Sequence, residues 1–174
     1  MSIGIRALIA TGIDSIQLDI LVFGPQVSAL SSDARTLSLQ KKRIQIRHEL
    51  ISRGHNAKYA EELVDQTLAG PDGNAAFQEL LIMDSYDLVV NVVDSPGSIV
   101  EATMISVIPT IAQKTSLFLD GNYVGGLVHS TCLQAAEFGA HFQTYVYPTD
   151  LDDCHLLGFV LDRVRITQKK KYLS

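Results

Sequence analysis

Short apolar runs alternate along the chain with longer segments in which apolar residues recur at helical spacing. The runs predict β-strands over residues 18–23, 88–93, 115–119 and 142–146, with residues 55–59 as a further, shorter candidate. The run at 88–93 is almost continuously apolar, which suits a central strand of a parallel sheet that helices cover on both faces. It ends at a Pro-Gly turn signal in residues 94–97.

The segments between the runs predict helices over residues 37–53, 74–83, 98–108, 128–138 and 154–164. In the first of them the spacing separates an apolar side, with Leu39, Ile46, Leu50 and Ile51, from a basic side, with Lys41, Lys42, Arg43 and Arg47. Residues 1–17 could add a preceding helix that the pattern does not place, and residues 70–73 carry a turn signal.

This alternation predicts an α/β fold, a three-layer Rossmann-like (flavodoxin-like) sandwich with about five parallel strands. The length of 174 residues fits a single domain over residues 1–174. In such sheets ligands bind outside the carboxyl ends of the strands, where the strand order reverses. The loops after Phe23 and Val93 are therefore the first places in which to expect a site.

The charge composition indicates which kinds of partner the protein can bind. The chain has 14 Lys and Arg residues against 19 Asp and Glu residues, a net charge of −5, and no direct nucleic-acid binding is expected because such binding normally needs a clustered positive face. The basic run Lys169-Lys170-Lys171 is either a solubilising tail or a contact for a phosphate or a partner.

The cysteines and the apolar stretches of the sequence argue against a metal site and against a membrane-spanning segment. Cys132 and Cys154 form no Cys-x-x-Cys pair and have no His at zinc-like spacing, so no metal site is expected. The apolar stretch 3–13 is too short to span a bilayer and contains Arg6, so we expect no membrane association and a cytoplasmic location. Neither a dinucleotide-binding glycine motif nor a phosphate-binding P-loop occurs.

The most informative segment follows the apolar run at 88–93. Asp94, Ser95 and Glu101 gather at the carboxyl end of this predicted strand, and a helix is expected to begin near Ser98. Free backbone N–H groups at a helix N-terminus can hold a phosphate or a carboxylate. A purely structural interpretation is also open, because Ser98 followed three residues later by Glu101 has the spacing of a capping box.

The pattern Ser95-x-Gly97-x-x-x-Glu101 resembles the nucleoside deoxyribosyltransferase and nucleotide N-glycosidase superfamily. The segment from Asp94 to Glu101 is most similar to the Ser-Pro-Gly-Ser-x-x-Glu segment of effector proteins encoded beside bacterial retrons, and the resemblance covers roughly residues 18–147. These families share a Rossmann-like fold with nicotinamide-dinucleotide-cleaving domains of the Toll/interleukin receptor type. The chain departs from the pattern at Ala102-Thr103, where the family usually has an apolar residue and then Gly.

The resemblance implies catalytic roles for two carboxylates. Glu101 takes the position of the carboxylate that attacks the anomeric carbon or stabilises the cationic sugar, and Asp94 could protonate or orient the departing base. It also implies substrate binding by Ser95, which could hold a sugar hydroxyl or a 5′-phosphate, by its neighbours Gly97 and Ser98, and by Gly24 and Pro25 after the first strand.

The function implied is hydrolysis or transfer of an N-glycosidic bond in a nicotinamide dinucleotide, a nucleotide or a deoxynucleoside, without cofactor or metal. The retron likeness implies a phage-defence toxin held in check by a partner, such as a reverse transcriptase or another protein of the defence system. A homo-oligomer is expected because deoxyribosyltransferase relatives build their sites at subunit contacts. Two alternatives stay open. The first is a catalytically silent nucleotide-binding or protein-interaction module, which the missing Gly after Glu101 favours. The second is a phosphoribohydrolase resembling the cytokinin-activating family, whose Pro-Gly-Gly-x-Gly-Thr-x-x-Glu signature is only partly kept at Pro96-Gly97-Ser98.

Overall fold

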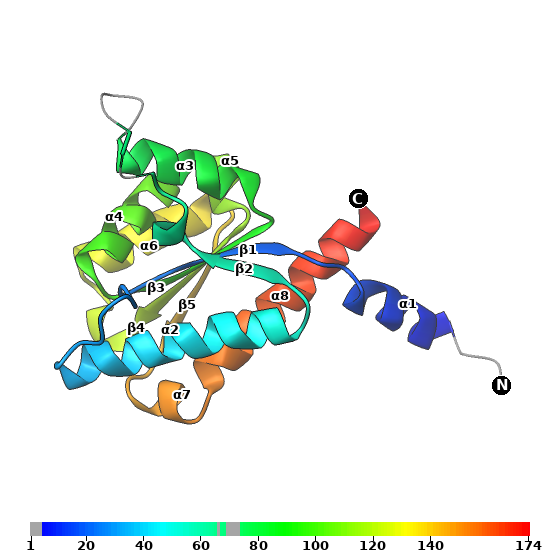
Figure 1. Cartoon of the computed structure of the whole chain (residues 1–174), viewed down its shortest axis with the longest axis horizontal. Helices are drawn as coiled ribbons and strands as arrows, with labels where there is room; N and C mark the ends of the chain where they lie inside the picture. Colours follow the sequence, from blue (N-terminus) through cyan, green and yellow to red (C-terminus); the bar gives the residue numbers. More distant parts are fainter. Residues whose placement is uncertain (1–4, 66, 69–73) are drawn as a thin grey trace.

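The computed structural model describes residues 5–65, 67–68 and 74–174, and the turn expected at residues 70–73 lies outside this part of the chain. Its centre is a sheet of five parallel strands in the order β2-β1-β3-β4-β5 (Figure 1). The strands are β1 (Asp19–Phe23), β2 (Asn56–Tyr59), β3 (Leu88–Val93), β4 (Thr115–Asp120) and β5 (His141–Tyr145). The predicted three-layer Rossmann-like fold is thus confirmed.

Helices cover both faces of the sheet (Figure 1). One face packs against α2 (Ala34–Ser52), α7 (Thr149–Asp152) and α8 (His155–Leu173). The other packs against α3 (Ala75–Ser85), α4 (Pro96–Ile105), α5 (Pro109–Ala112) and α6 (Leu127–Glu137). Helix α1 (Ile5–Asp14) contacts α8, and short 3₁₀ turns, η1 (Ala60–Glu62) and η3 (Gly121–Tyr123), follow β2 and β4.

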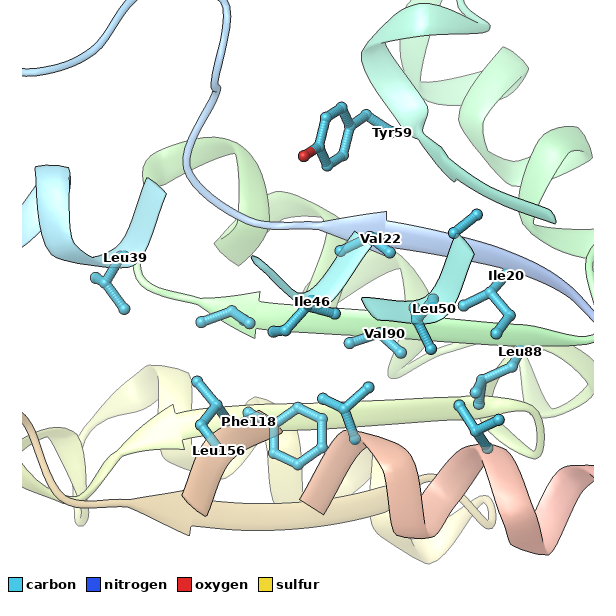
Figure 2. Close-up of a cluster of buried hydrophobic side chains, with 14 of the residues drawn as sticks. Ile20, Val22, Leu39, Ile46, Leu50, Tyr59, Leu88, Val90, Phe118 and Leu156 are labelled. Atoms are coloured by element: carbon cyan, nitrogen blue, oxygen red, sulfur yellow. The ribbon is translucent and has the colours of Figure 1, made fainter. Parts of the chain in front are cut away.

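Alternation of side chains explains why β3 lies at the centre. Val90 faces the layer of α2 and α8, whereas Val89 and Val93 face the layer of α4 and α6, so both faces of the strand are buried. Figure 2 shows Val90 on the same buried face of the sheet as the β1 side chain Val22 and the β4 side chain Phe118, together with helix residues such as Leu50. Burial of this kind provides most of the favourable free energy of such a fold.

Asn91 is the polar exception within β3. It is fully buried, and its Nδ2 donates a hydrogen bond to the backbone oxygen of Ser98 over 3.0 Å. Since Ser98 lies in the first turn of α4, this bond fixes the start of that helix against the strand that precedes it. The loop between β3 and α4 is therefore held at both ends.

Several element boundaries differ from the prediction. Helix α4 begins at Pro96, before the expected residue 98, and α8 continues to Leu173, well beyond the expected residue 164. The expected basic side of α2 is also wrong in part, because Arg43 and Lys42 are buried and Ile51 is exposed. Among the described residues, no helix combines the length and the apolar character needed to cross a membrane.

Candidate functional site

The strand order reverses at the junction between β1 and β3, because β1 is followed by β2 on one side while β3 continues to β4 on the other. A cleft of about 310 Å³ opens there, at the carboxyl ends of the two strands, which is where ligands bind in open α/β sheets. It is lined by Gly24, Gln26, Glu61, Glu79, Ser95, Gly97 and Glu101. The two loops expected to border a site, after Phe23 and after Val93, both contribute to the cleft.

Two serines form the N-terminal cap of α4. Ser95 is the N-cap residue, and its Oγ accepts a hydrogen bond from the backbone N–H of Ser98 over 3.3 Å. The Ser98 Oγ in turn accepts from the backbone N–H groups of Asp94 and Ser95, at 3.0 and 2.9 Å. The capping box is thus Ser95 with Ser98, and the structural interpretation that paired Ser98 with Glu101 is wrong.

Glu101 lies in the second turn of α4, where no capping role exists for it. Its Oε2 is buried and has no hydrogen-bond partner within the described part of the chain. Its Oε1 is directed toward the first turn, since a Cβ placed on Gly97 would lie 3.9 Å from it. Gly97 therefore leaves open the space beside the carboxylate.

The surroundings of Glu101 favour its protonated form. Burial raises the pKa of Glu101 to about 8, and the negative charges of Glu79 and Glu61 add to this shift while the positive charge of Arg43 opposes it. Glu79, on α3, has its own pKa raised, first by burial and then by the charge of Glu61. The cleft thus holds three carboxyl groups from three different elements.

Arg43 holds the β1 side of the cleft in place. This fully buried side chain donates to both carboxylate oxygens of Glu61, each at 2.7 Å, and to the backbone oxygens of Val22 and Pro25, at 2.6 and 3.0 Å. Its guanidinium also lies 4.4 Å from the centre of the Tyr59 ring. The ion pair joins a buried guanidinium to the more exposed carboxylate of Glu61, and the hydrogen bonds of Arg43 fix the loop after β1. Within the described residues, Glu61 is the one cleft carboxylate that forms an ion pair with a cationic side chain.

Gly24 is required where the chain leaves β1. Its φ is +147°, and a Cβ there would lie 3.3 Å from Cδ of Arg43, so a side chain at this position would be both strained and crowded. Pro25 is buried and does not line the cleft, and its part in the structure is the carbonyl that accepts from Arg43.

Asp94 belongs to a neighbouring cluster outside the cleft lining. Its Oδ1 accepts from Nη2 and Nε of Arg35, at 2.6 and 3.1 Å, and Nη1 of Arg35 also bonds Asp120 at 2.7 Å. The Arg35 guanidinium lies over the rings of Tyr123 and Tyr147, at 5.5 and 4.5 Å from their centres. Asp94 is therefore held in an ion pair with Arg35, and the Arg35 guanidinium lies over two aromatic rings.

The structure brings together only part of the predicted site. Glu101, Ser95, Gly97 and Gly24 line the cleft, whereas Ser98, Pro25 and Asp94 bond to protein groups around it. Sequence reasoning missed Glu61, Glu79 and Arg35 and misplaced Arg43. These residues carry no motif, and their positions depend on the packing of separate elements.

The three carboxyl groups do not form a metal centre, since no group of His, Cys, Asp and Glu residues in the described ranges could hold a metal ion. Comparison with known proteins gives no family assignment: no family model matches the sequence, and no curated protein matches it significantly.

Proposed function

We propose that this protein hydrolyses or transfers the N-glycosidic bond of a nucleoside-type substrate, with Glu101 as the catalytic carboxylate. One observation carries the proposal: Glu101 lines the cleft at the strand reversal with a buried oxygen that has no partner among the described residues. An unpartnered buried carboxylate is unfavourable for the fold, and perturbed groups of this kind concentrate at functional sites. The resemblance around Ser95, Gly97 and Glu101 supports the same residue.

The chemistry requires a negative charge beside the sugar. As the bond from the anomeric carbon to the base nitrogen breaks, the base leaves with the electron pair and the sugar gains oxocarbenium character. A carboxylate of low solvation either stabilises this cation or bonds to the anomeric carbon until water or another acceptor replaces it. Glu101 suits either role once it is ionised.

The acidic cleft favours a substrate with a positive charge at the scissile bond. Glu101, Glu79 and Glu61 all line it, and a bound cation would lower the pKa of Glu101 and so ionise it. Among a nicotinamide dinucleotide, a nucleotide and a deoxynucleoside, only the first carries a cationic base at that bond. We therefore expect a nicotinamide dinucleotide to be the preferred substrate.

The position of Asp94 agrees with this choice. A nicotinamide leaves as a neutral molecule and needs no proton, whereas an unprotonated purine is a poor leaving group and usually needs a general acid. Asp94, expected to supply such a proton, is bonded to Arg35 and does not line the cleft. Its proposed role is therefore to position Arg35 and the loop after β3. Ser95, which lines the cleft, is proposed to hold a sugar hydroxyl.

The wider context of the proposal rests on resemblance. The likeness to retron-associated effectors supports a cytoplasmic toxin of phage defence, kept inactive by a partner such as a reverse transcriptase. It also supports a homo-oligomer, as in the deoxyribosyltransferases. An adjacent reverse transcriptase gene would support this context directly.

Chromatography of reaction mixtures tests the proposed activity. The purified protein is incubated separately with a nicotinamide dinucleotide, a nucleoside 5′-monophosphate and a deoxynucleoside, and the released base is measured over time. We expect release of nicotinamide from the first and much slower release of base from the others. An absence of base release from all of them would contradict the proposed activity.

A silent nucleotide-binding module of the same fold is the second candidate. The observation in its favour is the raised pKa of Glu101, because a protonated carboxyl cannot stabilise a cation. Calorimetry with the same compounds distinguishes the two: a silent module would bind without turnover, and Glu101→Ala would leave its affinity nearly intact.

A further inference from the structure

A second cavity lies at the opposite end of the sheet from the Glu101 cleft. It has a volume of about 300 Å³ and lies beside Leu88, the first residue of β3, and Lys114, which directly precedes β4. The C-terminal turns of α8 form its other wall, on the side of the molecule where the chain enters β1 (Figure 1).

Positive charge gathers in this cavity although the chain as a whole is acidic. Its lining includes Lys114, Arg163, Lys170 and Lys171 but only one acidic residue, Asp87. Arg163, Thr167 and Lys170 share one face of α8 because they are spaced at four and three residues along the helix. The hydroxyl groups of Thr167 and Ser174 also line the cavity.

Not all of this charge is matched by the protein. Lys171 is paired with Asp87 at 2.7 Å, and Lys114 donates to the backbone oxygen of Asp84 and lies 3.7 Å from its carboxylate. Arg163 and Lys170 have no side-chain hydrogen bond or ion pair within the described part of the chain, and the Nε of Arg163 is buried. Two positive charges thus remain available to a ligand.

An ordinary structural role accounts for the lysines but not for Arg163. Lysines in the last turn of α8 offset the partial negative charge of its terminal carbonyl groups. Arg163 lies two turns earlier, where this effect has faded. A half-buried guanidinium without a partner is unfavourable, and buried polar groups in native proteins are usually satisfied by water or a ligand.

Two further buried polar atoms that have no hydrogen-bond partner among the described residues lie beneath α8. They are the Oγ of Ser116 and the Nδ1 of His141, whose residues are register partners in β4 and β5. The His141 ring packs against Phe118 on the face of the sheet that α8 covers, and burial and the charge of Arg163 lower the pKa of His141. The region is thus polar and incompletely satisfied by protein groups.

We propose that this cavity is a binding site for the phosphate group of a small phosphate monoester, with Arg163 and Lys170 as its charged ligands. The charge of a phosphate monoester near −2 matches these two unpaired cations, and the planar guanidinium fork suits phosphate oxygens. The hydroxyl groups of Thr167 and Ser174 already donate to the backbone oxygens of Arg163 and Lys171, each over 3.0 Å, so the two side-chain cations carry the recognition. This inference is independent of the activity proposed for the Glu101 cleft.

Calorimetric titration with ribose 5-phosphate, with ribose as the phosphate-free probe, tests the site. We expect saturable binding of ribose 5-phosphate and none of ribose. Arg163→Gln should weaken the affinity by about tenfold or more, since it removes a charge-assisted hydrogen bond, and Lys170→Gln by several-fold. Lys169→Gln is the matched control, because Lys169 lies on the same helix but does not line the cavity. The affinity of this variant for ribose 5-phosphate should equal that of the wild type.

Several results would overturn the site. They are an absence of saturable heat, equal binding of ribose, or the same loss of affinity in Lys169→Gln as in Lys170→Gln, which would indicate diffuse attraction. Binding of a single-stranded oligonucleotide with 5′-hydroxyl ends, without binding of ribose 5-phosphate, would also overturn it in favour of a nucleic-acid contact. Lys170 is exposed, so its variant preserves the test even if Arg163→Gln fails to fold.

Discussion

At the scale of single residues, Glu101 is held in surroundings that oppose its ionised form. Its carboxyl group is buried in a cleft with two other acidic side chains, and one of its oxygens has no partner among the described residues. Such a group destabilises the fold whenever it carries its charge. A residue kept under these conditions is more readily explained by chemistry than by folding.

Glu101→Gln should therefore stabilise the protein at alkaline pH. The pKa of Glu101 is about 8 in the folded protein and near its ordinary value of 4.5 when the chain is unfolded. Between these values the folded state holds a proton that the unfolded state has lost, so the free energy of unfolding of the wild type falls as pH rises. Each pKa unit corresponds to about 1.4 kcal/mol, so Gln should add a few kcal/mol above pH 8.

Urea unfolding of the two proteins at pH 5 and pH 9 checks this expectation. The stability difference should be small at pH 5 and should grow toward pH 9. Glu137→Gln, at an exposed position near the end of α6, is the control and should show no such growth. A difference between wild type and Glu101→Gln that does not change with pH would contradict the buried, uncompensated state of Glu101.

Arg43→Ala should destabilise the protein by about 3 kcal/mol, because it removes a fully buried side chain that donates to two backbone carbonyls and pairs with Glu61. Arg53→Ala, which breaks an exposed pair with Glu49 on the same helix, should cost about 0.5 kcal/mol or less. Urea unfolding of both variants measures the contrast. Equal losses would mean that Arg43 does not hold the loop after β1.

Single-residue signals explain which site residues the sequence could reveal. Glu101, Ser95 and Gly97 stand in one short motif after an apolar strand, so pattern and resemblance locate them. Glu61 and Glu79 come from other segments and reach the cleft only through packing. Arg43 follows the helical spacing of a basic side, but its ion pair with Glu61 makes burial possible, and no spacing rule contains that pairing.

At the scale of elements, the start of α4 depends more on Ser98 than on Ser95. Ser98→Ala would leave two backbone N–H groups without their acceptor in a buried place, and we expect a loss of about 2–3 kcal/mol. Ser95→Ala removes an N-cap and should cost about 1 kcal/mol. Thermal unfolding ranks the two variants, and a reversed order would contradict the proposed capping arrangement.

The boundaries of the helices and strands are the part of the fold that the hydropathy pattern predicts least well. The strands are found because runs such as 88–93 are apolar on both faces, and the shorter candidate at 55–59 also proves to contain β2. The helix begins before the expected residue 98 because Ser95 and Ser98 are both good capping residues, and in the folded protein Ser95 is the N-cap while Ser98 completes the capping box. The end of α8 was missed because its last turns are polar.

At the scale of the whole molecule, the alternation of strands and helices was enough to predict the layers, but not the strand order. That order is set by how the strands pair, and hydropathy alone does not encode pairing. The location of the cleft was still predictable, because ligands bind at the carboxyl ends of parallel strands. The loops after β1 and β3 both border it, as expected.

Self-association stays a prediction at this scale. The segment that follows β4 exposes Tyr123, Val124 and Leu127, the last with 85% of its surface accessible. Such grouped apolar side chains are typical of contacts between subunits. Light scattering at tens of micromolar should show an oligomer, and Leu127→Lys should shift it toward the monomer. A wild-type protein that is monomeric at these concentrations would contradict the expectation.

The most direct test of the account is the rate of nicotinamide release by wild-type protein and Glu101→Gln, measured beside their melting temperatures. Gln keeps the size of the side chain but cannot carry the charge that the oxocarbenium ion needs, so the rate should fall by about a hundredfold or more. The melting temperature at pH 8 should rise, because the wild type has by then lost most of the stability that protonated Glu101 provides at low pH. Release at a near wild-type rate by a folded Glu101→Gln variant would contradict the catalytic assignment of Glu101.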